Sequence, residues 1–351
     1  MKRTAEKIFL AGWLLAISSA TTFGDGPKVA KYAGEFIAIG VGGRALGMGG
    51  AFVAVANDVT AGYWNPAGLS QIRYTEITLM HDERFAGLVN YDYGAVAFPS
   101  GSKASIGFSV IRLGVDGIPD TRDALVDAST ADLVKIYDIY NPNARIDPSR
   151  VTYFNSADWA FFLTYAKQLT EDFSYGANLK FIRRDMGSNS ATGIGFDLGG
   201  RMLLMGRLAL GVNLQDITTT LIAWDTGTKE LISPTAKIGG AYFIDLLGGR
   251  IAPAVDFDVR FENRRYASTA HLGPVSADLH AGLEYDFQSI VAVRVGYTDV
   301  KQLTLGAGVH LPKLDVDYSF ARFDSEGQLG NTHRISLKLT LSEDRFRRSV
   351  E

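Results

Sequence analysis

The chain has 351 residues, of which 46% are hydrophobic and 21% charged, with a net charge of −3, 38 glycines and no cysteine. Its glycines follow no period, which excludes collagen, and the near-neutral charge provides no basic surface for nucleic acid. Without cysteine there is no disulfide, thiolate metal site or cysteine nucleophile. The mean hydropathy of +0.05 is too apolar for a disordered chain, and the charges are too evenly spread for a helical membrane protein.

Residues 1–24 have the pattern of a secretory signal peptide. Lys2, Arg3 and Lys7 precede an apolar run over residues 8–17, and small residues follow, with cleavage expected after Ala20 or Gly24. The run is about ten residues long, roughly half of what a spanning helix needs. A short amphipathic helix of a cytoplasmic protein is the alternative. We therefore expect an exported chain.

Residues 74–341 alternate between apolar and polar side chains with a period of two. Between Ile290 and Tyr297, for example, valines alternate with Ala292, Arg294 and Gly296. Successive side chains of a strand point to opposite faces, so each such segment has one apolar face. The pattern predicts about fourteen strands, near residues 74–81, 91–98, 104–113, 158–168, 173–184, 192–204, 207–215, 235–244, 250–262, 276–287, 290–297, 302–310, 314–323 and 331–341.

The predicted connections alternate between longer and shorter almost to the end of the chain. Residues 114–157, 216–234 and 263–275 are long, whereas residues 169–172 and 205–206 are short. Transmembrane barrels have short turns at the periplasmic end and long loops outside. An even strand number and this alternation favour an all-β, fourteen-stranded antiparallel transmembrane barrel in the outer membrane over a soluble sandwich.

In a sandwich the aromatic face would form the core, whereas in a membrane barrel it would face lipid. The barrel interpretation therefore assigns the opposite, charged face to the lumen. The candidates for the lumen lining are Asp256, Asp258, Arg260, Glu262, Asp278, His280, Glu284, Arg294, Asp315 and Asp317.

Residues 25–73 precede the barrel and show no alternation. They contain a glycine-rich stretch, a short apolar run and the pair Asn65–Pro66, which suits a helix start with asparagine as the N-cap and proline at the first position. The segment is too apolar for a flexible tail. We expect it to fill the lumen.

Two stretches of this segment, GRALGMGGAF from Gly43 and WNPAGL from Trp64, resemble the PorV/PorQ family of FadL-like outer-membrane barrels. The resemblance extends along the chain and implies fourteen strands with the N-terminal segment as a plug inside the barrel. It marks as the plug motif Gly43, Arg44, Gly47, Gly49, Gly50, Asn65, Pro66 and Ala67. Many outer-membrane proteins end on an aromatic residue, whereas a charged tail, residues 342–351, follows the last strand here and contains Phe346.

Three other patterns have simpler explanations. Gly40, Gly42 and Ala45 approximate a dinucleotide-binding fingerprint, but no βαβ pattern surrounds them. The carboxylates Asp256, Asp258 and Glu262 resemble a glycosidase pair, and His280 resembles a metal ligand or a hydrolase histidine, yet lumen lining accounts for them. Residues 133–140, an apolar patch in the first long loop, either cap the barrel or contact a partner or hydrophobic ligand.

We therefore expect a non-enzymatic protein with no catalytic, cofactor-binding or metal-binding residues, surrounded by outer-membrane lipid. The resemblance implies a partner of type IX-like protein secretion, which contacts secretion-system proteins or cargo. The alternative is a FadL-like channel for long-chain fatty acids or other hydrophobic small molecules. A surface hydrolase built on a barrel is a third hypothesis. Resemblance determines architecture better than activity.

Overall fold

The computed structural model describes residues 28–29, 33–130, 132–134, 141–261, 268–322 and 331–349. The predicted signal peptide, Glu262 and residues 135–140 of the apolar loop patch lie outside the described residues. Within the described part of the chain, no helix is long and apolar enough to cross a membrane.

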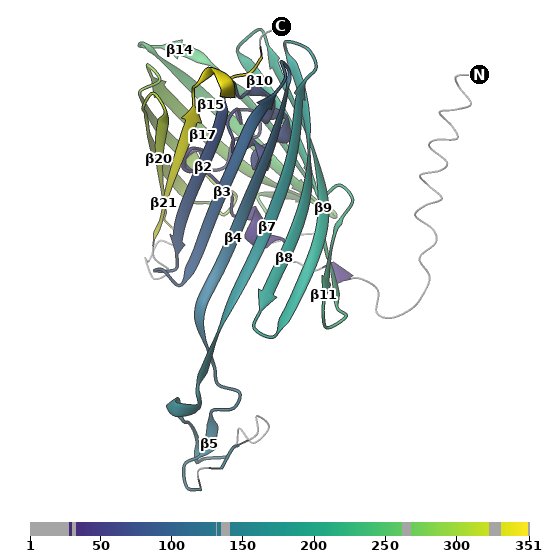
Figure 1. Ribbon diagram of the computed structural model, residues 1–351, viewed down its shortest axis with the longest axis vertical. Coiled ribbons are helices and arrows are strands. Elements are labelled where there is room, and N and C mark those ends of the chain that lie inside the picture. Colours follow the sequence, from purple (N-terminus) through teal and green to yellow (C-terminus); the bar gives the residue numbers. More distant parts are fainter. Residues whose placement is uncertain are drawn as a thin grey trace, which may run out of the picture.

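Fourteen antiparallel strands form a closed barrel (Figure 1). They are β2 (Thr75–Arg84), β3 (Val89–Ser100), β4 (Ala104–Asp120), β7 (Thr152–Gln168), β8 (Phe173–Met186), β9 (Asn189–Leu204), β10 (Leu208–Gln215), β13 (Thr235–Tyr242), β15 (Gly249–Arg260), β17 (Val275–Phe287), β18 (Val291–Tyr297), β19 (Leu303–His310), β20 (Leu314–Arg322) and β21 (Asn331–Leu341). The first and last strands close the ring, with Thr75 opposite Leu341 and Glu83 opposite His333. Closure leaves no strand edge unpaired, as a wall in lipid requires.

The predicted strands are confirmed, and most of their ends agree within two or three residues. The largest differences are at β4 and β7, which continue past the predicted ends at residues 113 and 158 into an arm beyond the barrel (Figure 1). The prediction missed several short strands, which are too brief to show alternation. These are β1 (Lys28–Val29), β5 (Leu125–Asp127), β6 (Ala144–Ile146), β11 (Thr220–Trp224), β12 (Lys229–Ile232), β14 (Ile244–Leu246) and β16 (Ala270–Leu272).

The barrel has two different ends. At the turn end, residues 101–103, 169–172, 205–207, 243–248, 288–290 and 311–313 join the strands, and the C-terminus lies at this end (Figure 1). At the loop end, residues 121–151, 216–234 and 261–274 form long connections. The predicted alternation of lengths is wrong at one place, because β8 and β9 continue until only residues 187–188 join them at the loop end.

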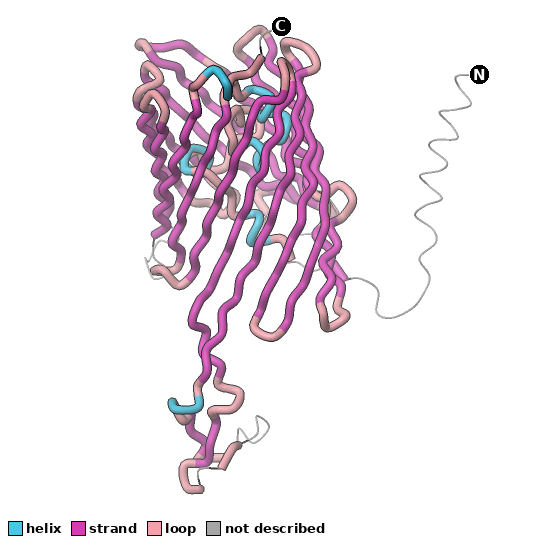
Figure 2. Tube along the Cα trace, viewed as in Figure 1, coloured by secondary structure: helices cyan, strands magenta, loops and turns pink. Residues whose placement is uncertain are grey.

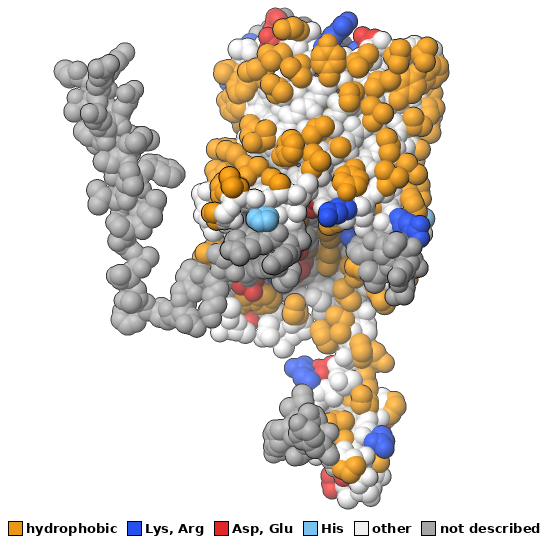
Figure 3. Space-filling view, turned by 180° about the vertical axis from the view of Figure 1, so that it is seen from behind, with side chains coloured by type: hydrophobic (Ala, Val, Ile, Leu, Met, Phe, Trp, Pro, Cys, Tyr) orange, Lys and Arg blue, Asp and Glu red, His pale blue; other side chains and the backbone are white. Residues whose placement is uncertain are grey.

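The strand faces follow the predicted assignment. Along β18, Val291, Val293 and Val295 are exposed, whereas Ala292 and Arg294 are buried. Hydrophobic side chains cover the outward face shown in Figure 3, with charged ones mainly toward the ends and on the arm. A soluble sandwich would show the reverse, so the barrel interpretation is correct.

Residues 33–73, here called the inner segment, lie inside the ring of strands (Figure 2). Four short helices form there, α2 (Glu35–Ala38), α3 (Gly43–Gly47), α4 (Ala61–Trp64) and the 3-10 helix η1 (Pro66–Gln71). Asn65 caps η1 as predicted, because its side-chain oxygen accepts a hydrogen bond of 3.1 Å from the Ala67 N–H. Two more 3-10 helices lie elsewhere, η3 (Pro148–Arg150) on the arm and η4 (Asp344–Phe346) in the tail.

Glycines of the wall allow the inner segment to approach backbone to backbone. A Cβ added at Gly282 would lie 2.5 Å from the Met48 carbonyl oxygen, and one at Gly211 would lie 2.5 Å from that of Val53. A Cβ atom essentially never lies this close to a heavy atom to which it is not bonded, so alanine at either position would displace the inner segment. The high glycine content thus has a packing function on the inward face.

We expect Gly282→Ala to lower the free energy of unfolding by about 1–3 kcal/mol through overpacking. Gly240→Ala is the matched control, because the atom nearest to its added Cβ would be Leu210 Cδ2 at 3.6 Å, an ordinary van der Waals distance. Urea unfolding of the detergent-solubilised protein would measure both. Equal destabilisation by the two variants would contradict the close packing of the inner segment against β17.

Candidate functional site

An ion-pair network joins the inner segment to the wall. The guanidinium of Arg44, in α3, donates two hydrogen bonds of 2.8 Å to the carboxylate of Glu284 in β17. Glu284 also accepts from Arg294 at 2.6 Å, and Arg294 in turn donates to Asp317 at 2.7 Å. Despite burial, the carboxylates of Glu284 and Asp58 raise the pKa of Arg44 above its usual value. The network therefore ties α3 to the wall of the barrel.

Wall side chains also bind the backbone of the inner segment. The Asp256 carboxylate accepts hydrogen bonds from the N–H groups of Phe52 and Val53, at 2.6 and 2.7 Å. In the opposite direction, the Asn65 side chain donates to the Gly200 carbonyl of β9 at 3.0 Å. Asn213 donates to the Trp64 carbonyl at 2.9 Å. These bonds satisfy backbone groups that the short, interrupted helices leave without partners.

A second charged group lies at the loop end of the lumen. Asp258 pairs with Lys237, and His280 Nε2 lies 3.5 Å from the same carboxylate. The other ring nitrogen of His280 lies 2.8 Å from the carbonyl oxygen of Gly49. Arg260 approaches Asp258 to 4.0 Å. One buried carboxylate thus faces three basic side chains.

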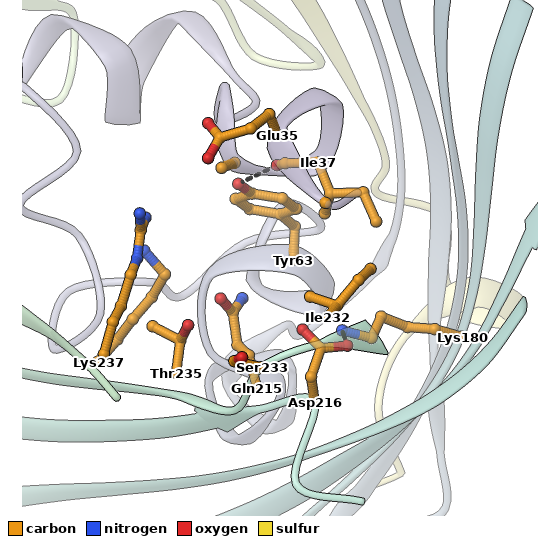
Figure 4. Close-up of a pocket in the computed structure, with 13 residues that line it drawn as sticks. Glu35, Ile37, Tyr63, Lys180, Gln215, Asp216, Ile232, Ser233, Thr235 and Lys237 are labelled. Atoms are coloured by element: carbon orange, nitrogen blue, oxygen red, sulfur yellow. Dashed lines mark hydrogen bonds and ion pairs between the residues drawn. The ribbon is translucent and has the colours of Figure 1, made fainter. Parts of the chain in front are cut away.

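Two adjoining cavities open beside this group. One of 220 Å³ is lined by Leu46, Trp64 and His280 together with residues 298–300 and Gln302 of the loop between β18 and β19. A smaller one of 60 Å³ lies next to α2, where Tyr63 donates a hydrogen bond of 2.6 Å to the Ile37 carbonyl (Figure 4). The cavities share lining residues from α2 and from the wall, namely Glu35, Ala38, Lys237 and Arg260.

The structure places the predicted lumen residues on the inward face wherever it describes them. Asp256, Asp258, Asp278, His280, Glu284, Arg294 and Asp317 are buried there, and Asp315 pairs with Lys338 at 2.8 Å. The motif residues Gly43, Gly47 and Gly49 pack against wall backbone. Gly50 lies 3.1 Å, measured from an added Cβ, from His280.

The sequence analysis missed a buried pair of carboxylates around Lys180. Its ammonium contacts Asp197 at 2.8 Å and Asp216 at 2.6 Å, and the latter accepts a hydrogen bond from Thr220. Figure 4 shows Lys180 pointing to Asp216 at the edge of the smaller cavity. Strand alternation placed Lys180 and Asp197 inward, but Asp216 lies in a loop, where no periodicity applies.

The polar side chains around Asp256 and Asp258 contact one another and the backbone of the inner segment. His280 contacts a backbone carbonyl and Asp258, and Asp258 is held by Lys237. Asp256 binds two backbone N–H groups. Among the described residues, no three histidine, aspartate or glutamate side chains are grouped so as to hold a metal ion. These contacts hold the inner segment in place, and the two cavities lie beside them.

We expect Glu284→Gln to lower the free energy of unfolding by about 3–5 kcal/mol, because two buried guanidiniums lose the carboxylate between them. Asp245→Asn is the matched control, since Asp245 pairs with Arg250 on the exposed surface and should change stability by less than about 1 kcal/mol. Urea titrations of both variants provide the comparison. A loss for Glu284→Gln no larger than for the control would show that the network does not stabilise the fold.

Comparisons with known proteins support the architecture. Residues 14–111 match the model of an uncharacterised protein family, UPF0164. The search of curated proteins gave no match.

Among solved structures, the toluene transporter TbuX of Ralstonia pickettii is similar with a TM-score of 0.55 and 11% identity, covering 86% of this chain and 98% of that one. The monoaromatic hydrocarbon channel CymD has a TM-score of 0.54 and 14% identity, covering 87% and 98%. A FadL homologue of Pseudomonas aeruginosa has a TM-score of 0.50 and 12% identity, covering 84% and 97%. The chain therefore has the fold of the FadL-like fourteen-stranded barrels.

Proposed function

We propose that the protein is an outer-membrane channel that takes up a small molecule through its loop end. The observation that carries this proposal is the cavity of 220 Å³ above a lumen filled by the chain's own inner segment. An apolar outward face, short turns at one end and long loops at the other support an outer-membrane location, with the loop end outside. The inner segment, by its position, would serve as the plug that closes the turn end.

The lining of the cavity favours a ligand with an apolar part and an acidic group. Ile39, Leu46 and Trp64 supply apolar surface. The ionisable part of the lining contains four Arg or Lys residues and His280 against three carboxylates, of Glu35, Asp258 and Asp299. Arg84 and Arg334 pair with Asp82, and Lys237 pairs with Asp258. Arg260, which lies 4.0 Å from Asp258, is therefore the basic group best placed to attract an anion. A short fatty-acid-like carboxylate combines these properties and suits the small volume.

Passage through the barrel would require the inner segment to move. Glu284 and Asp256 hold it by ionic and backbone hydrogen bonds. His280 contacts both Asp258 and the carbonyl of Gly49, which lies just after α3. A ligand that competes for the basic groups near Asp258 would therefore act beside α3. We propose that ligand entry and displacement of the plug are linked there.

A role in protein secretion remains a second proposal, favoured by the arm formed by β4, β7, β5 and β6. The arm extends beyond the barrel at the loop end (Figure 1) and exposes Leu133, Ile146 and Tyr153. Exposed apolar side chains of this kind suit a protein contact.

Shortening residues 116–155 to a tight turn tests this proposal. Under the secretion proposal, the change would abolish co-purification of an outer-membrane partner from detergent extracts. Under the channel proposal, it would leave ligand binding unchanged.

We expect the purified protein to bind octanoate and to bind octanol more weakly, because only octanoate carries a charge for the basic lining. Arg260→Gln should weaken octanoate binding about tenfold, which corresponds to about 1.4 kcal/mol. Arg250→Gln, at an exposed site, is the control for loss of charge. Isothermal titration calorimetry in detergent measures these affinities. Equal binding of octanol and octanoate, or an unchanged affinity in Arg260→Gln, would contradict the proposed ligand class.

A further inference from the structure

Another pocket, separate from the two lumen cavities, lies at the turn end of the barrel. It has a volume of 390 Å³ and is lined by Arg73, Ser102, Lys103, Gln168, Arg347, Arg348 and Ser349. Among these described residues, four are basic and none is acidic. Such an excess of one charge in a concave site favours an anionic ligand.

The C-terminal tail completes this pocket. The Arg348 guanidinium donates hydrogen bonds to the carbonyls of Ser70, Ile72 and Ala104, at 2.9, 2.7 and 2.8 Å, and to the Ser105 hydroxyl at 2.7 Å. Its backbone N–H donates to the carbonyl of Arg73 at 2.7 Å. Because these acceptors carry no net charge, the positive charge of Arg348 is not neutralised by them.

Two further arginines are positioned by the same attachment. Arg347 forms an isolated bridge with Tyr74, so it lies next to Arg73 at the start of β2. Both arginines are exposed. Ser102 and Lys103 also have contacts elsewhere. Recognition of an anion is therefore assigned to the side chains of Arg73 and Arg347, whereas Arg348, whose guanidinium N–H groups donate to the protein, adds positive charge to the pocket.

The pocket lies immediately next to the apolar outward face. In the register of the wall, Phe98 is opposite Ile106, and Ile106 is opposite Tyr165. Phe98 and Tyr165 are 42% and 44% exposed, which places them in the outward apolar face. Ser102 and Lys103 follow in the turn that joins β3 to β4. A molecule anchored in the pocket by an acidic group would thus have apolar wall directly above it.

We propose that this pocket binds the phosphate group of a membrane phospholipid, with the acyl chains lying along the wall near Phe98, Ile106 and Tyr165. Arginine guanidiniums match phosphate oxygens in geometry and charge. Basic pockets at a membrane surface are suited to anionic headgroups. The apolar surface beside the pocket favours a lipid over a free phosphate ion. This inference concerns the turn end and does not depend on the proposed uptake function.

The test compares three probes on the full-length protein in detergent: dihexanoylphosphatidylglycerol, dihexanoylglycerol and inorganic phosphate. The readout is the temperature at which the folded band disappears on a denaturing gel. We expect the phospholipid to raise this temperature by a few degrees, as a ligand specific for the folded state does. Dihexanoylglycerol, which lacks the phosphate, and inorganic phosphate, which lacks the chains, should each have a smaller effect.

The double variant Arg73→Gln/Arg347→Gln should lose most of the phospholipid effect, and Arg73→Lys/Arg347→Lys should retain part of it. The matched control is Arg207→Gln/Arg250→Gln, which removes the same charge from exposed residues at the turn end and should keep the full effect. If the Gln double variant does not fold, a phospholipid effect that is smaller in the Lys variant than in the unchanged protein, with the full effect kept in the control, tests the same point.

Several outcomes would overturn the proposal. Equal stabilisation by dihexanoylglycerol would show that no phosphate is recognised. Equal stabilisation by inorganic phosphate would identify a free-phosphate site rather than a lipid site. Equal loss in the Gln variant and the control would show that only net charge matters, and no stabilisation by the phospholipid would exclude the site.

Discussion

The structure depends on two buried carboxylates of the barrel wall, those of Glu284 and Asp256, which find partners in the inner segment. Glu284 binds Arg44, and Asp256 binds two backbone N–H groups. A buried carboxylate is costly unless it is paired or hydrogen-bonded. The wall therefore needs the inner segment to satisfy its own polar groups. The inner segment in turn needs the wall, because its helices have only four to six residues.

Glycine makes this mutual dependence geometrically feasible. On the inward face, Gly282 and Gly211 leave the room that the backbone of Met48 and Val53 occupies. The outward face follows a different rule, since bulky apolar side chains such as those of β18 must contact lipid. A strand of the wall can thus combine large apolar residues on its outward face with glycine on its inward face. The mean hydropathy near zero is the average of these two surfaces.

Much of the fold was predictable because strand alternation is a local property. It located the fourteen strands and assigned Glu284, Arg294 and Asp317 to the lumen. The pairing of Arg44 with Glu284 was not predictable, because it depends on the register of distant strands and on how the barrel closes. Asp216 and Arg348 were missed for a related reason, since each lies outside a strand and acts through tertiary contacts. The PorV/PorQ resemblance implied that residues 25–73 fill the lumen, and the described part of them, residues 33–73, lies there, while the similar solved structures share the fold of the FadL-like barrels.

The attachment of the C-terminal tail has a consequence for the order of assembly. Arg348 binds Ser70 and Ile72, at the joint where the inner segment continues into the first strand of the barrel. The residues of this joint precede every strand of the barrel, whereas Arg348 follows the last strand, β21. A chain truncated after β21 could pair all its strands and still lack the hydrogen bonds of Arg348 to Ser70 and Ile72. Contacts made by the segment after β21 are thus needed to secure the inner segment to the first strand.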